Sequence, residues 1–342
     1  MDLKLYTIRL LKKEEYGDAI DFIRKYWSER HVFCRNKEIF EFQHGDAASG
    51  EYDFIVAVHN ETGEIHATLG YISSSIYDGG SKENPESVAG VLWKVRDDVK
   101  NKEIGSLGLG VLFYLMKKFP DSAYLALGLS EYSQKIYKAL HFNFATMAHY
   151  YIASKYTPEF HIVDKPYVNK ESKCNPDYDV RIIESIPDNF ESAYYPRKSS
   201  EYIRRRYIEH LFYKYQLCGI YKDEVLKCVW VIRPTDVEGS RVIRLVDMVG
   251  DLSEVKNIEG NVHELLKALN AEAIDCYNYG IDSKVFADAG FASVSGDTIV
   301  PNYYEPFLRE NVDMHCASYA KKPVVMFKGD SDQDRPNLLE QQ

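Results

Sequence analysis

The sequence has few cysteines, and none of them is arranged to bind a metal or to cross-link a small domain. The 342 residues include six cysteines, with no C-x-x-C pair and no histidine at zinc-finger spacing. Scattered cysteines of this kind are typical of reduced thiols in a cytosolic protein. We therefore expect a cytoplasmic location and no metal site.

Long apolar runs and an excess of basic residues are also missing. The first residues, MDLKLYTIRLLKKEE, lack the apolar core of a signal peptide. No later run approaches the roughly 20 apolar residues of a membrane helix, so we expect no membrane partner. The net charge of −10 repels a phosphate backbone, so we expect no nucleic-acid partner.

The length and the order of patterns predict two α/β domains. A chain of 342 residues is too long for one ordinary core and suggests two domains of roughly 150 residues. Alternating and helical periodicities predict the following elements in the first half: strand 2–10, helices 14–30 and 36–44, hairpin 52–59 and 64–73, strand 88–95, a glycine loop 105–110, helix 111–119, strand 123–129, helix 131–140 and a strand region 142–154.

The second half repeats this order after a polar, proline-containing stretch. From residue 179 a strand, a helix, a hairpin, a strand, a helix, a strand and a short helix follow in turn. We predict a first domain at 1–155, a linker at 156–178 and a second domain at 179–342. Each domain should hold a mixed sheet flanked by helices. The polar tail from residue 329 should be exposed or draped over the surface.

The glycine-rich segment is the most informative motif. Gly105, Gly108 and Gly110 lie between a predicted strand and a predicted helix. Backbone N–H groups freed by glycine, together with a helix start, can hold a pyrophosphate without a basic side chain. A Rossmann fingerprint fails because no further glycine follows at the required spacing, and a Walker loop fails because Gly-Lys-Ser/Thr is missing. A tight turn with close helix packing remains the alternative.

Two spaced motifs make the first half resemble the GNAT superfamily of acyl-CoA N-acyltransferases. Gly105-x-x-Gly108-x-Gly110 resembles the family's pyrophosphate loop, with Gly105 where the family has Arg or Gln. Tyr137-x-x-x-His141-Phe142 resembles its Tyr-x-x-x-Gly-Phe motif, with histidine for glycine. The resemblance covers roughly residues 2–154. The second half ends its short helix with Gly290-Phe291 but has no paired glycine loop, so it resembles a degenerate copy.

The resemblance implies a tandem GNAT-like fold and a set of site residues. The co-substrate would be acetyl-CoA or another acyl-CoA. Backbone N–H groups of the Trp93–Val95 strand would polarise the thioester carbonyl, and Tyr137 would protonate the departing thiolate. The candidates for binding the cofactor are Trp93, Lys94, Val95, Gly105, Ser106, Leu107, Gly108, Leu109 and Gly110.

The general base is open among several residues. Glu29 and His31 lie near the end of the first helix, where the fold lines its acceptor cleft. His66, on the second hairpin strand, and the adjacent carboxylates Asp97 and Asp98 are further candidates, and a water chain could also serve.

The predicted activity is transfer of an acetyl or acyl group to a primary amine of a small molecule, such as an amino sugar or a nucleotide-linked amino sugar, by a monomer or homodimer. The sequence also resembles acyltransferases of surface-polysaccharide gene clusters. Two alternatives are a non-catalytic ligand-binding scaffold that retains the fold and a Fem-like peptidyltransferase, against which the acidic charge argues. The basic cluster around Arg204, Arg205 and Arg206 is interpreted as a solvated helix.

Overall fold

The computed structural model describes residues 3–45 and 49–336, which form two compact units. The first unit holds Met1–Ala126, Tyr319–Lys321 and Arg335–Gln342, and the second holds Leu127–Ser318 and Lys322–Asp334. The predicted first domain, 1–155, thus spans the main segment of the first unit and continues into the second. The predicted linker, 156–178, belongs to the second unit. Its Ile162 and Val163 are buried in an apolar cluster there.

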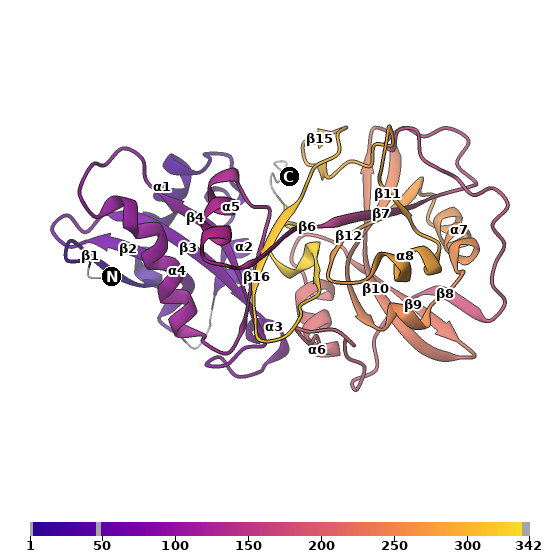
Figure 1. The fold of residues 1–342 in the computed structure, drawn as a ribbon, viewed down its shortest axis with the longest axis horizontal. Coiled ribbons are helices and arrows are strands. Elements are labelled where there is room, and N and C mark those ends of the chain that lie inside the picture. The colour runs from indigo at the N-terminus through magenta and orange to yellow at the C-terminus, as the bar shows by residue number, and fades with distance from the viewer. Residues whose placement is uncertain (1–2, 46–48, 337–342) are drawn as a thin grey trace. The chain divides into compact units, whose positions relative to one another are not determined.

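The first unit is a twisted sheet with helices (Figure 1). Its strands are β1 (Tyr6–Lys12), β2 (Glu51–His59), β3 (Ile65–Ser73), β4 (Ser87–Val95) and β5 (Ala123–Leu127), and its helices are α1 (Tyr16–Tyr26), α2 (Lys37–His44), α3 (Ser75–Asp78) and α4 (Leu107–Lys118). The strand order is β1-β2-β3-β4-β5, with antiparallel pairing up to β4 and parallel pairing of β4 with β5. The predicted hairpin forms β2 and β3, and Gly63 takes the positive φ of 71° in its turn.

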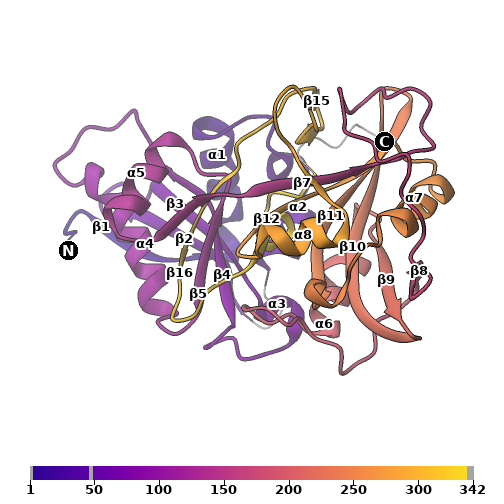
Figure 2. The same ribbon diagram turned by 45° about the vertical axis from the view of Figure 1, so that its right-hand side comes forward.

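The second unit contains a larger sheet with the order β13-β7-β12-β11-β10-β9-β8. The strands in this part of the chain, which do not all belong to that sheet, are β6 (Asn143–Thr146), β7 (Ala148–Ala153), β8 (Tyr178–Ile183), β9 (Gln216–Lys222), β10 (Val225–Val237), β11 (Ser240–Gly250), β12 (Ala273–Tyr279), β13 (Ala292–Ser293), β14 (Tyr303–Tyr304), β15 (Phe307–Leu308), β16 (His315–Tyr319) and β17 (Met326–Phe327). Its helices are α5 (Glu131–Ala139), α6 (Ser200–Ile203) continued by a π-helical turn (Arg204–Ile208), α7 (Glu259–Ala268) and α8 (Ser283–Ala289). β7 pairs with β12 in the antiparallel direction, and the β7 ribbon is seen along its length in Figure 2.

The two units repeat one topology, as the order of sequence patterns predicts. In each, four antiparallel strands are followed by a helix and a fifth, parallel strand: β1–β4, α4 and β5 in the first unit, and β8–β11, α7 and β12 in the second. The parallel pairing is equally short in both. It joins Ser87–Ala89 to Ala123–Leu125 in the first unit and Ile243–Leu245 to Ile274–Cys276 in the second. The fold is therefore an α/β fold built from two copies.

Residues 329–336 are buried or half-buried, which corrects the prediction of a tail exposed or draped over the surface for this stretch, while the rest of that predicted tail, 337–342, lies outside the described residues. Arg206 donates hydrogen bonds to the carbonyl oxygens of Gly329 (3.1 Å) and Ser331 (2.6 Å). Arg233 holds the Asp334 carboxylate through two hydrogen bonds of 2.9 and 2.8 Å. The polar composition of this segment suggested exposure, but buried cations from other elements of the second unit satisfy it.

The basic cluster accordingly divides into two parts. Arg204 is exposed and Arg205 is half-buried, and both pair with Glu201 at the surface, as a solvated helix predicts. Arg206, in contrast, is buried, so the interpretation as a solvated helix is wrong for this residue. Within the ranges that the structure describes, no helix is both long enough and apolar enough to cross a membrane.

Candidate functional site

The candidate site begins where β4 and β5 separate. Their parallel pairing ends at Ala89 and Leu125. Beyond it, a shift in the β3–β4 register places Leu92 and Trp93 opposite a single residue of β3, and Leu92 takes a φ of 49°. The Thr68 hydroxyl donates to the Leu92 carbonyl at 3.0 Å and holds this bulge. Because a bulge bends its strand, the second half of β4 is turned relative to the first.

The bulged half of β4 presents a backbone donor on its open side. The Arg96 N–H donates to the His66 carbonyl at 3.0 Å, which makes these residues a hydrogen-bonded pair of the antiparallel ladder. Such pairs alternate with pairs whose N–H groups point away from the partner strand. The N–H group of Val95 therefore points away from β3, on the side where β5 no longer pairs. Val95 is one of the residues whose N–H the family resemblance assigns to the thioester carbonyl.

The glycine segment is helical, which corrects the predicted loop at 105–110. A 3-10 turn, Ile104–Ser106, leads directly into α4, so Gly108 and Gly110 lie in the first turn of the helix. The Trp93 indole N–H donates to the Gly108 carbonyl at 3.1 Å. A Cβ on Gly110 would lie 2.7 Å from Ile8 Cδ1. At Gly110, close helix packing thus explains the glycine, which was the alternative left open by the sequence.

Gly105 differs from the other two glycines because it faces open space. It is exposed, and a Cβ added there would meet nothing within 4 Å. Asn101 Oδ1 accepts the N–H groups of Glu103 and Ile104, both at 2.9 Å, while those of Ser106 and Leu107 reach carbonyl oxygens of the same turn.

The structure describes all of residues 103–107. Of their backbone N–H groups, only that of Gly105 donates no hydrogen bond to another residue. A helix start with a free N–H group favours an anion such as a phosphate oxygen. Two exposed lysines, Lys100 and Lys102, lie just before it in the chain. Sequence reasoning missed Asn101, although an Asn just before a helix is an ordinary N-cap signal.

The equivalent helix start in the second unit is filled by the chain itself. A Cβ on Gly260, in the first turn of α7, would lie 2.1 Å from the backbone carbonyl carbon of Lys173. The Asn175 N–H donates to Asn261 Oδ1 at 2.8 Å, and the Asn261 amide donates back to the Asn175 carbonyl. Residues 173–175 therefore pack against the first turn of α7, whereas no residue lies within 4 Å of a Cβ placed on Gly105 before α4.

The predicted catalytic residues are spread over both units. Tyr137 lies on α5 in the second unit, where it is buried and its ring lies 5.0 Å from that of Phe142. In the first unit Glu29 is exposed in a turn after α1. His31 is buried there, and its Nδ1 accepts the N–H of Phe33 at 3.3 Å. The structure brings Trp93 and Gly108 into direct contact, and the roles of Tyr137, Glu29 and His31 stay predictions.

The other base candidates have ionic or hydrogen-bond partners. Asp98 accepts hydrogen bonds from Arg96 (2.6 Å), Tyr26 (2.8 Å) and Lys25 (3.1 Å), and Arg96 holds the pKa of that carboxyl well below its usual value. Asp97 is exposed, and its carboxylate oxygen Oδ2 lies 3.6 Å from Lys94 Nζ. His66 is buried, and both of its ring nitrogens have partners.

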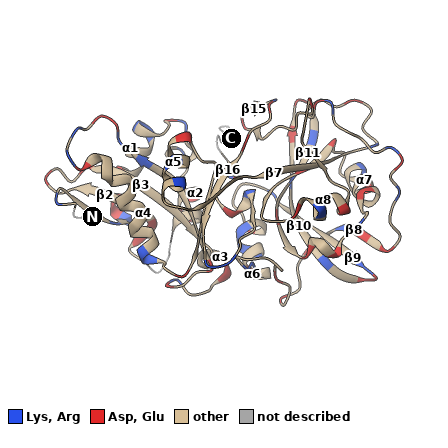
Figure 3. Ribbon diagram, in the orientation of Figure 1, with Lys and Arg blue, Asp and Glu red and all other residues tan. Residues whose placement is uncertain are grey.

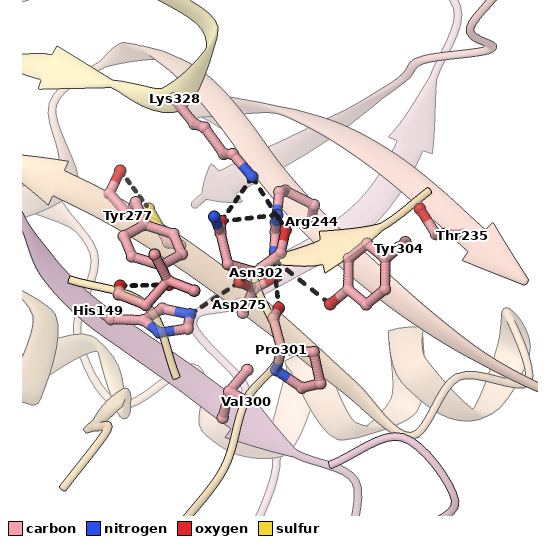
Figure 4. A network of polar contacts seen from close by, with 12 residues as sticks. His149, Thr235, Arg244, Asp275, Tyr277, Val300, Pro301, Asn302, Tyr304 and Lys328 are labelled. Carbon is pink, nitrogen blue, oxygen red and sulfur yellow. Dashed lines mark hydrogen bonds and ion pairs between the residues drawn. The ribbon is translucent and has the colours of Figure 1, made fainter. Parts of the chain in front are cut away.

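A buried polar network lies on the parallel strand pair of the second unit (Figure 4). Arg244 on β11 and Asp275 on β12 are register partners, joined by two hydrogen bonds of 3.1 and 2.8 Å. His149 Nε2 on β7 contacts the same carboxylate at 2.8 Å. Lys328 donates to the Asn302 side-chain oxygen at 2.7 Å. Five separate segments of the second unit are tied together in this way.

Burial sets the charge states in this network. Burial by itself raises the pKa of Asp275, but Arg244 and His149 lower it to about 2. Burial lowers the pKa of His149 and, together with the nearby Arg244, moves the pKa of Lys328 well below its ordinary value. An ion pair this deeply buried and this well hydrogen-bonded acts as a structural tie, because removing either charge would leave the other uncompensated. Polar residues within the otherwise apolar run RVIRLVDMV were the sequence signal for it.

Charged residues elsewhere are mixed in sign. Figure 3 shows Lys and Arg interspersed with Asp and Glu in the described parts of both units. The exposed lysines before α4 are therefore a local feature rather than part of a large basic surface.

Comparison with known proteins gives the fold a name. No protein-family model and no curated protein matches the sequence. A GCN5-related N-acetyltransferase from Anabaena variabilis matches with a TM-score of 0.52 at 8% identity, over 91% of this chain and 72% of that one. A conserved Enterococcus faecalis protein of unknown function, described as a probable N-acyltransferase, matches with a TM-score of 0.51 at 8% identity, over the same shares. At this identity the likeness concerns the fold alone. The chain therefore has the fold of the GCN5-related (GNAT) acyltransferases, in two tandem copies.

Proposed function

We propose that the protein is an acyl-CoA-dependent N-acyltransferase that moves an acetyl or acyl group to a primary amine. The GNAT fold supports this proposal, but a fold alone hosts many functions, so the site must support it as well. The observation on which it rests is the difference between the two copies. The helix start at Gly105 is open with a free N–H group, whereas the start of α7 is filled by residues 173–175.

In this proposal the first unit binds the acyl-CoA. The Gly105 N–H and the start of α4 receive a pyrophosphate oxygen, and Lys100 and Lys102 supply positive charge to the phosphates. The backbone N–H groups of Trp93 and Val95 donate to the thioester oxygen, which gains negative charge as the amine attacks. The amine nitrogen forms the new C–N bond, the C–S bond breaks, and CoA leaves as its thiolate, which takes up a proton.

The remaining assignments rest on the family resemblance. Tyr137 is the proposed proton donor to the thiolate, and Glu29 and His31 are the proposed groups that take the proton of the amine. The proposed acceptor is a small-molecule amine, an amino sugar or its nucleotide conjugate, and the proposed setting is the cytoplasm, as a monomer or homodimer.

The test measures thiol release from acetyl-CoA while amino sugars and nucleotide-linked amino sugars are screened as acceptors. Above-background release with one of them supports the proposal. With that acceptor, Tyr137→Phe should lower turnover by about 10²-fold, the low end for a general acid, and leave acetyl-CoA affinity nearly unchanged. CoA binding without turnover on any amine would favour the ligand-binding scaffold instead.

A further inference from the structure

A chain of hydrogen bonds runs from the interior of the first unit to the start of α4. His66 Nε2 lies 3.2 Å from a Glu64 carboxylate oxygen, and His66 Nδ1 lies 2.9 Å from the Tyr6 hydroxyl. The Asn101 amide nitrogen lies 2.5 Å from the same hydroxyl. Asn101 Oδ1 in turn accepts the backbone N–H groups that precede Gly105. Three side chains from β1, β3 and the loop before α4 thus connect in one line.

The direction of each bond in this line is determined by its neighbours. Because Asn101 Oδ1 accepts two backbone N–H groups, the atom facing Tyr6 is the NH₂ group, which can only donate. The Tyr6 oxygen therefore accepts from Asn101 and donates its own proton to His66 Nδ1. His66 is then the neutral tautomer with its proton on Nε2, where the Glu64 carboxylate accepts it.

Burial makes this line costly to break. Tyr6 is 5% exposed and His66 is 4% exposed, so water does not readily replace a lost partner. A buried polar group left without a partner costs more than the hydrogen bond contributed. A second contact ties the same turn to the same strand start, since a Glu103 carboxylate oxygen accepts the Leu5 N–H at 2.9 Å. The position of the Asn101 cap is thus set by residues that lie far from it in sequence.

We propose that Tyr6 and His66 are positioning residues of the acyl-CoA site, which hold the Asn101 cap so that the Gly105 N–H is presented to the pyrophosphate. This role rests on the proposed function of the same site. Neither residue contacts the CoA in this account. They act through Asn101, which orders the turn before the ligand arrives, and preorganisation of this kind raises affinity because binding no longer has to order the turn.

The role implies a dependence on pH. The groups that face His66 are Tyr6 from β1, His59 from β2, stacked at 5.2 Å, and Glu64 and Arg96 from the ends of β3 and β4. Burial lowers the pKa of His66, and Arg96 and His59 lower it further, against the opposing effect of Glu64. Protonation would place a hydrogen on Nδ1, and the Tyr6 hydroxyl would lose its acceptor. Acid should therefore loosen the cap.

The experiment measures the Kd of free CoA by calorimetry for the full chain and three variants. Tyr6→Phe removes the central hydroxyl and should weaken binding about tenfold at pH 7, the order expected for a lost buried hydrogen bond. His66→Asn keeps an acceptor near the position of Nδ1 and should bind within about twofold of the wild type. Tyr16→Phe is the matched control, because its hydroxyl donates to the Phe33 carbonyl at 3.3 Å in the same unit, away from α4.

The pH series gives a readout that a merely structural role would not change. Between pH 8 and pH 5, the ratio of the wild-type Kd to the His66→Asn Kd should rise, because titration of CoA's own phosphates is common to both proteins. If circular dichroism shows that Tyr6→Phe does not fold, the comparison of wild type with His66→Asn still tests the positioning role.

The outcomes separate the two proposals. If the wild type does not bind CoA, both the proposed function and this role are wrong. If the wild type binds but folded Tyr6→Phe has the same Kd, or Tyr16→Phe loses as much affinity, the positioning role alone is overturned. A Kd ratio that does not change with pH overturns the part played by His66.

Discussion

The indole N–H of Trp93 on β4 donates to the backbone carbonyl of Gly108 in the first turn of α4, at 3.1 Å. This bond links the bulged strand to the helix that follows the open turn. Trp93→Phe keeps an aromatic ring but removes the donor, and a typical internal hydrogen bond contributes about 0.5–1.5 kcal/mol. We expect urea unfolding to show a loss of that size.

Trp27→Phe is the control for this measurement, because Trp27 is 47% exposed and its replacement should change the free energy of unfolding by less than about 0.5 kcal/mol. Equal effects of the two replacements would contradict a role for the Trp93 hydrogen bond.

The two helix starts predict opposite results for one substitution. Gly105→Ala places a methyl group in open space and should be neutral or stabilise the protein by about 0.4–1 kcal/mol, because alanine restricts the unfolded chain. Gly260→Ala places the same group 2.1 Å from the Lys173 backbone and should cost at least about 1–3 kcal/mol. Thermal unfolding of both variants checks this. A Gly260→Ala protein as stable as Gly105→Ala would refute the filled start of α7.

The buried pair of Arg244 and Asp275 predicts a large effect from a small change. Asp275→Asn leaves the Arg244 charge without its counter-ion and should lower the free energy of unfolding by about 3–5 kcal/mol. Asp236→Asn breaks the exposed pair with Arg241 in the same unit and should cost less than about 1 kcal/mol. Urea unfolding at pH 7 distinguishes these, and similar losses would mean that the buried pair is not a structural tie.

The same pair gives a pH dependence whose sign is fixed. The folded pKa of Asp275 is about 2, below the ordinary value of about 3.9 expected when unfolded. The stability that it contributes is therefore present above about pH 4 and is lost as the pH falls through about 2. The lowered pKa of His149 adds a loss that begins as the pH falls below about 6.5. Acid titration of wild type and Asp275→Asn should show a smaller acid-induced loss in the variant.

The sequence predicted the elements of the fold better than their contacts. The apolar alternation in 52–59 and 64–73 corresponds closely to β2 and β3, because each strand is specified by its own residues. The pairing of β7 with β12 joins residues more than a hundred positions apart, and no local pattern contains it. The burial of the segment around Asp334 was missed for the same reason, since the partner Arg233 lies far away in the chain.

The glycine segment stays the predicted site, but its backbone is helical rather than a loop. Glycines signal a turn and close packing equally well, so the sequence predicts a loop at Gly108 and Gly110, whereas both belong to α4. The role of Gly105 stays a prediction, with which the open space around this residue is compatible. The bulge at Leu92 and the line from His66 through Tyr6 to Asn101 depend on register and side-chain direction, which composition and spacing do not specify.

Calorimetric titration of CoA into Gly105→Asp tests the proposed binding of the CoA pyrophosphate at the Gly105 turn. The added carboxylate meets no neighbouring atom, so the fold should persist, while its charge repels the phosphates and should weaken binding by about tenfold or more. Gly17→Asp is the matched control, because Gly17 is also an exposed glycine with open space, in the first turn of α1 in the same unit. Wild type and Gly17→Asp should bind CoA alike, and Gly105→Asp should bind far more weakly. A folded Gly105→Asp protein with the wild-type Kd would contradict the proposed binding.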